Sequence, residues 1–130
     1  MTLTGGCKCG RVRYHVTGDP VRTGICHCVT CRKDSGSAFS FFAIWPREAV
    51  TLSGELGCWE SRAGGDRFCQ TCGSSLFCWS DEFDEIEIKL GTLDEPPKTI
   101  VPIYELWTIR REHWLAPLEG ASQHERDRPR

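Results

Sequence analysis

The sequence predicts a mainly β fold, and three observations lead to this expectation. Several short segments alternate apolar and polar residues with the period of two that half-buried strands show. Turn-forming residues separate these segments, because the 130 residues include 13 Gly and 7 Pro. No segment of any length repeats its apolar residues with the helical period. Many short strands between Gly and Pro turns are typical of an all-β domain.

The alternation and the turn residues together predict eight strands. The expected strands cover residues 12–16, 21–25, 38–45, 49–53, 56–61, 76–79, 86–90 and 100–107. The clearest is the seventh, in which Ile86, Ile88 and Leu90 alternate with charged residues. The fourth and fifth are expected to form a hairpin about Ser53-Gly54. Residues 32–37 are polar and contain a glycine, so we expect a single helical turn or a loop there.

The length of 130 residues indicates one domain. We expect residues 1–118 to form this domain. Residues 119–130 are polar and are expected to be a flexible C-terminal tail. Just before the tail, Trp114-Leu115 is expected to fill an apolar gap in the core.

Charge and composition exclude several classes of partner. The net charge of −2 and the pI of about 6.1 give no general attraction to nucleic acid or to an anionic membrane. The longest apolar run, residues 41–45, is far too short to span a bilayer. Residues 1–5 lack the basic region and apolar core of a signal peptide. We therefore expect a cytoplasmic protein, monomeric or homodimeric, with no membrane partner.

The nine cysteines are the strongest functional signal in the chain. Seven of them fall into three tight motifs, namely Cys7-x-Cys9, Cys26-x-Cys28-x-x-Cys31 and Cys69-x-x-Cys72. In a reducing compartment, clustered cysteines more often bind a metal than form disulfides. The C-x-x-C spacing in particular is typical of thiolate ligands of zinc. The motifs therefore predict bound zinc.

The seven clustered cysteines can be divided between two sites. Two pairs make a closed site of four thiolates, and three thiols remain for a second site. This arithmetic favours two zinc ions per chain, with a structural zinc on Cys7, Cys9, Cys69 and Cys72 and a second zinc on Cys26, Cys28 and Cys31. A rival division stays open at this point. It joins Cys28 and Cys31 to Cys69 and Cys72, as in a zinc ribbon.

The second site could be closed by a fourth protein ligand or left open. Candidates for a closing ligand are His27, Cys58, Cys78 and His113. In a strand, however, His27 would point to the face opposite Cys26 and Cys28. Cys58 and Cys78 could equally be small buried apolar residues.

An open site of three thiolates has a definite chemical character. Its soft ligands favour a further thiolate, so the site suits binding and activation of a small thiol or of a thiol adduct. The carboxylates of such a thiol would need cations nearby. Candidates are Arg32, Lys33, Arg47 and Arg62.

Three stretches of the chain resemble one known family. They are residues 5–14, 26–33 and 68–76, which contain the three cysteine motifs and their flanking glycines. In spacing and order they resemble the glutathione-dependent formaldehyde-activating enzyme family, also called the GFA or CENP-V domain. The resemblance extends over about residues 3–115. It implies an Mss4-like fold of several small coiled antiparallel sheets stabilised by zinc.

The resemblance also implies an activity. It assigns the structural zinc to the four-cysteine set and a catalytic-type zinc to Cys26, Cys28 and Cys31. The implied enzyme is a carbon–sulfur lyase like S-hydroxymethylglutathione synthase, which joins glutathione, or a similar small thiol, to formaldehyde. The alternative is a non-catalytic zinc-binding module for a protein or nucleic-acid partner, and the acidic pI argues against nucleic acid.

Overall fold

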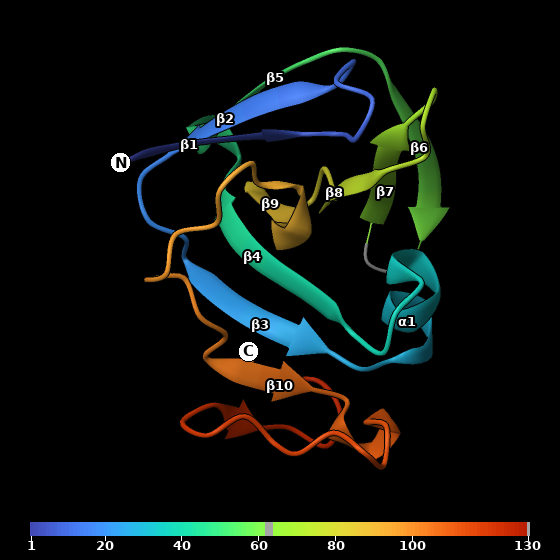
Figure 1. Cartoon of the computed structure of the whole chain (residues 1–130), viewed down its shortest axis with the longest axis vertical. Helices are drawn as coiled ribbons and strands as arrows, with labels where there is room; N and C mark the ends of the chain where they lie inside the picture. Colours follow the sequence, from blue (N-terminus) through green and yellow to red (C-terminus); the bar gives the residue numbers. More distant parts are fainter. Residues whose placement is uncertain (62–63, 130) are drawn as a thin grey trace.

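The computed structural model describes residues 1–61 and 64–129, and these residues form a mainly β fold, as predicted (Figure 1). The strands are β1 Thr2–Gly6, β2 Arg13–Thr17, β3 Arg22–Cys26, β4 Ser40–Pro46, β5 Val50–Ser53, β6 Leu56–Ser61, β7 Gly64–Cys69, β8 Ser75–Trp79, β9 Glu85–Lys89, β10 Tyr104–Leu106 and β11 Ser122–Gln123. The helical segments are α1 Val29–Ser35 and the 3₁₀ turns η1 Arg47–Ala49, η2 Leu90–Thr92 and η3 Thr108–Arg110. No helix in these two ranges is long and apolar enough to cross a membrane.

The strands form two sheets. The smaller sheet has the order β1-β2-β5, and the larger has the order β11-β10-β3-β4-β9-β8-β7-β6. Neighbouring strands are antiparallel, except that β10 runs parallel to both β3 and β11. Figure 1 shows the small sheet above the curved larger one, with the C-terminal segment lying along β3. The larger sheet therefore brings the C-terminal part of the chain beside residues 22–26.

The alternating residues of the sequence form the main core between the sheets. Tyr14 and Val16 of β2 are buried, and so are Ile86 and Ile88 of β9, as their period of two predicts. The ring of Tyr14 meets that of Phe77 edge-on, with 5.1 Å between centroids. Burial of one face of each strand thus fixes both the strands and their packing.

Three expectations about local structure are wrong. The fourth and fifth predicted strands form no hairpin, because β5 pairs with β2 in the small sheet and β6 pairs with β7 in the large one. Trp114 is 64% exposed and fills no gap in the core. The last predicted strand shortens to β10, since Pro102 lacks the N–H that a paired strand donates.

The short helix α1 follows the second cysteine motif directly. Cys28 caps its first turn, because the Cys28 Sγ accepts the N–H of Cys31 at 3.4 Å. The helix ends at Gly36, which has a φ of 61°. The helix begins at Val29, three positions before the helical turn or loop expected at residues 32–37, and it includes Cys31.

A glycine allows β10 to pack against β3. The ring of Tyr104 lies over Gly24, where a Cβ atom would be 2.5 Å from the ring. The chain then returns as β11, and the Trp107 N–H donates to the Arg126 carbonyl at 3.1 Å. The predicted division into a domain of residues 1–118 and a flexible tail concerns mobility and stays a prediction.

Candidate metal centres

Four cysteines that are far apart in the sequence lie together at one end of the small sheet. The sulfur atoms of Cys7, Cys9, Cys69 and Cys72 all lie within 4.8 Å of one another. Cys7 and Cys9 follow β1, whereas Cys69 ends β7 and Cys72 lies in the turn before β8. The Cys9 Sγ is 3.5 Å from that of Cys7 and 3.7 Å from that of Cys69. This group, the four-cysteine centre, joins the two sheets.

Backbone N–H groups point at the sulfurs of this centre. Val12 donates to the Cys7 Sγ at 3.2 Å. Thr71 and Cys72 donate to the Cys69 Sγ at 3.4 and 3.5 Å. Because such bonds favour the thiolate form, and thiolates are the form that binds zinc, the residues fit a metal site.

The second turn of the four-cysteine centre depends on a glycine and a hydroxyl. Gly73 follows Cys72 with a φ of 78°, a conformation that side chains rarely adopt. The hydroxyl of Ser74 lies 3.2 Å from the Cys72 Sγ, and this bond is the main cause that lowers the pKa of the Cys72 thiol to about 5. Cys72 is therefore available as a thiolate near neutral pH.

Three further cysteines meet where β3 leads into α1 (Figure 1). Cys26 ends β3, Cys28 precedes the helix and Cys31 lies in its first turn. Their sulfur atoms also lie within 4.8 Å of one another. This group is called the three-cysteine centre below. The rival division, with Cys28 and Cys31 joined to the other pair, is not among the groups that the described residues form.

Within residues 1–61 and 64–129, no fourth His, Cys, Asp or Glu joins the three sulfurs. The proposed closing ligands lie elsewhere. The Nε2 of His27 is 2.8 Å from the Oε1 of Glu105. Cys58 is exposed on β6 and Cys78 is buried on β8. No two of the nine cysteines, all of which lie in the described residues, form a disulfide.

The three thiols interact strongly with one another. Hydrogen bonds from Cys26 and Cys31 lower the pKa of the Cys28 thiol. The hydrogen bond with Cys28 raises the pKa of Cys26, and those with Cys26 and Cys28 raise the pKa of Cys31. Adjacent thiolates repel one another, so each of the three thiols opposes the ionisation of the others. A bound divalent cation would remove this repulsion, so the donor set fits a soft metal such as zinc.

Apolar side chains cover one side of the three-cysteine centre. Cys26 belongs to a buried cluster with Phe42, Ile44 and Tyr104, against which Leu106 and Trp107 pack. Trp107 has a φ of 55°, the one positive value at a non-glycine position among the described residues. The C-terminal segment thus packs against the same cluster as the three cysteines.

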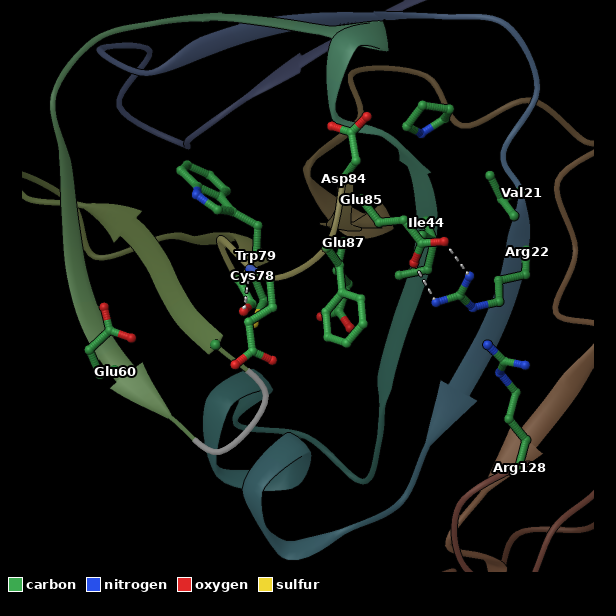
Figure 2. Close-up of a pocket in the computed structure, with 15 residues that line it drawn as sticks. Val21, Arg22, Ile44, Glu60, Cys78, Trp79, Asp84, Glu85, Glu87 and Arg128 are labelled. Atoms are coloured by element: carbon green, nitrogen blue, oxygen red, sulfur yellow. Dashed lines mark hydrogen bonds and ion pairs between the residues drawn. The ribbon is translucent and has the colours of Figure 1, made fainter. Parts of the chain in front are cut away.

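A cavity of about 1010 Å³ is lined by residues of the larger sheet (Figure 2). It lies on the face of that sheet to which Cys26 also points. Arg22 lines it, and Arg22 and Cys26 point to the same side of β3 because they are an even number of residues apart. Ile44 both lines the cavity and packs in the cluster of Cys26. The charged residues of the lining are Arg22, Arg128, Glu60, Glu82, Asp84, Glu85 and Glu87. The cavity thus offers both signs of charge, with Arg22 paired to Glu85 at 2.8 Å.

Sequence reasoning missed a partly buried cation on the same face of the sheet as Cys26. Lys89 is 14% exposed, and its Nζ lies 3.4 Å from the hydroxyl of Ser40, the residue that pairs with Cys26 across the sheet. Burial acts to lower the pKa of Lys89, but the carboxylates of Glu87 and Asp34 outweigh it and raise that pKa. Lys89 therefore stays charged.

The cations that sequence reasoning did select are used differently. Arg32 pairs with Glu112 at 3.5 Å, and the Arg47 guanidinium lies 4.4 Å from the centre of the Trp79 ring. Lys33 is exposed on α1. Arg62 lies outside the described residues.

Comparison with known proteins identifies the family. The family described as glutathione-dependent formaldehyde-activating enzyme matches residues 2–110. The chain belongs to this GFA family. The resemblance seen in the sequence is thereby confirmed.

Two individual proteins resemble this GFA-family chain. A Penicillium rubens protein, named provisionally as a glutathione-dependent formaldehyde-activating enzyme, is 34% identical over 77 residues. The match spans 55% of this chain and 40% of that relative. The crystal structure of a Rhodobacter sphaeroides protein superposes with a TM-score of 0.61 at 20% identity, over 77% of this chain and 98% of that one. The second comparison supports the fold.

Proposed function

We propose that this GFA-family chain is a zinc-dependent carbon–sulfur lyase. It would form or cleave the adduct between a small thiol such as glutathione and an aldehyde such as formaldehyde. The observation that carries the proposal is the three-cysteine centre, which has three sulfurs and, in the described residues, no fourth ligand. Family membership and the name of the Penicillium relative support the same substrates.

The proposal assigns a different role to each group of cysteines. Cys7, Cys9, Cys69 and Cys72 would hold a structural zinc, and Cys26, Cys28 and Cys31 a catalytic zinc. Zinc held by three thiolates would supply a position for a soft fourth ligand, which suits the sulfur of the substrate. Free thiols of this kind persist in a reducing compartment, so we propose that the protein works in the cytosol.

The proposed reaction moves one proton and two electron pairs, one from the sulfur and one from the C=O bond. A carbon–sulfur bond forms between the thiol sulfur and the carbonyl carbon, and the π electrons of C=O move to the oxygen. The thiol loses one proton, and that oxygen gains one proton. Cleavage is the reverse.

Residues around the centre suit this chemistry. Leu106 and Trp107 pack against the cluster of Cys26 and would limit the access of water from that side. Lys89, which pairs with Asp34 and Glu87, holds a partly buried positive charge beside Ser40, where it would favour negative charge developing on the oxygen. The cavity next to Ile44 has room for the rest of the thiol, and Arg22 and Arg128 are the cations of its lining.

The test is exchange NMR of formaldehyde with glutathione, with and without the zinc-loaded protein. We expect the protein to accelerate the exchange and Cys28→Ser to abolish the acceleration. Cys58→Ser is the matched control, because Cys58 is exposed and belongs to neither centre. If Cys28→Ser accelerates exchange as the wild type does, the catalytic assignment fails. A zinc-loaded wild type that leaves the exchange rate unchanged would favour a non-catalytic binding module.

A further inference from the structure

A buried carboxylate lies behind the loop that carries the three-cysteine centre. Glu105, on β10, is 2% exposed. Its oxygens accept hydrogen bonds from four donors, namely His27 Nε2 at 2.8 Å, Leu118 N at 2.8 Å, Gln123 Nε2 at 2.7 Å and Arg111 Nη2 at 3.3 Å. A carboxylate has about four acceptor positions, so Glu105 is fully engaged.

One of these donors belongs to a residue that lies, in the sequence, between two cysteines of the centre. His27 separates Cys26 from Cys28, and neighbouring side chains of an extended chain leave opposite faces. A fixed His27 ring therefore also fixes the directions of the Cys26 and Cys28 side chains. The ring is 1% exposed and meets Phe39 edge-on, with centroids 5.7 Å apart.

The same loop is held by backbone pairing. The His27 N–H donates to the Leu106 carbonyl at 3.0 Å, and Leu106 pairs with Cys26 in the parallel register of β10 and β3. Glu105 is itself held by Leu118 and Gln123, which lie further along the chain. Contacts thus run without a break from the C-terminal segment to the metal-binding loop.

We propose that Glu105 is a positioning residue for the three-cysteine centre. Through His27 it would hold the backbone between Cys26 and Cys28 in the shape that binds the metal. This inference rests on the second metal of the proposed function. Groups that orient metal-binding residues without touching the metal typically change its affinity by about 10–100-fold.

Glu105→Gln tests the proposal with little change in size. An amide has only one acceptor atom, so its NH₂ group would face at least one of the four donors. In zinc-loaded protein under reducing conditions, we expect a chromophoric chelator to remove the second zinc from this variant at about 10–100-fold lower chelator concentration than from wild type. The zinc of the four-cysteine centre should be released as in wild type and serves as a reference within the same molecule.

Two further variants complete the experiment. Gln123→Ala removes one exposed donor to Glu105, and we expect it to shift the second zinc in the same direction but less. If Glu105→Gln loses its cooperative melting transition, the release of the second zinc from Gln123→Ala decides whether Glu105 has the proposed role. Asp94→Asn is the control, because Asp94 bonds to Arg13 and Thr4 and belongs to neither centre.

The outcomes separate this inference from the proposed function. A wild type that binds only one zinc would overturn both. If wild type binds two zinc ions and both test variants release the second one as wild type does, only the role of Glu105 is overturned. The role is also overturned if both zinc ions shift together, since that result indicates general destabilisation.

Discussion

Replacement of Cys69 by serine should remove a large part of the stability of this fold. The Sγ atoms of Cys9 and Cys69 lie 3.7 Å apart, although the two residues are 60 positions apart in the chain. Cys69 is 1% exposed, so a serine hydroxyl would be buried where the metal ligand was. The variant therefore breaks a link between the two sheets.

The size of the effect follows from the length of the loop that the metal closes. For a cross-link over about 60 residues, the chain-entropy relation gives ~4 kcal/mol at 25 °C, and a metal clip restricts the unfolded chain in the same way. Domains of this size are stable by about 5–15 kcal/mol. We expect Cys69→Ser to lose at least ~4 kcal/mol. The melting temperature should fall by roughly 16 °C, at about 4 °C for each kcal/mol, or cooperative melting should disappear.

The assay is thermal and urea unfolding followed by far-UV circular dichroism, with zinc and a reductant present. Cys58→Ser is the control, and its free energy of unfolding should stay within about 0.5 kcal/mol of wild type. A chelator should lower the stability of the wild type toward that of Cys69→Ser and leave the variant unchanged. If Cys69→Ser unfolds within about 1 kcal/mol of wild type, the four-cysteine centre is not the link inferred here.

Three other perturbations have defined outcomes. Ile88→Ala, in the fully buried face of β9, should cost ~2–5 kcal/mol in urea unfolding, whereas Ile88→Val should cost only ~0.5–1.5; equal costs would contradict the packing. Gly73→Ala should lower stability by ~1–2 kcal/mol in thermal melts, because its φ is 78°; an unchanged melt would count against that turn. The Arg13 guanidinium lowers the pKa of Asp94 from 3.8 to about 2, so the stabilisation from this pair is present above pH 3.8 and is lost as the pH falls toward 2. The melting temperatures of wild type and Asp94→Asn should therefore converge over that range, and curves that stay parallel would exclude the pair as the cause.

The parts of the fold that the sequence predicts are those set by local spacing. The C-x-x-C motifs bring their sulfurs close within a few residues, and alternation in residues 12–16 and 86–90 identifies strands because burial of one face decides their structure. The division of the seven cysteines into four and three could also be argued by counting. It agrees with the groups that the structure forms.

Pairing between distant strands could not be predicted in this way. Ser53-Gly54 has the composition of a hairpin turn, yet β5 and β6 belong to different sheets. The choice depends on what each strand buries. Val50 pairs with Val16 of the small sheet, and Leu56 pairs with Cys69 of the large one.

The buried charges were missed for a different reason. Periodicity arguments treat a charged residue as exposed, so they overlook Lys89 and Glu105. Glu105 is buried and Lys89 is partly buried, and charged or polar groups surround both. For Glu105 a signal was present, since a single acid stands between Tyr104 and the apolar Leu106.

The distance in sequence between His27 and Glu105 sets an order of assembly during translation. The two residues are 78 positions apart. As the nascent chain leaves the ribosome, Cys72 emerges before Glu105, so the four-cysteine set can gather before β10 is outside the ribosome. The cysteines at positions 26–31 are synthesised early, whereas Leu106 and Trp107, which pack against the same cluster, are synthesised late. The topology therefore allows the four-cysteine centre to assemble before the surroundings of the three-cysteine centre are complete.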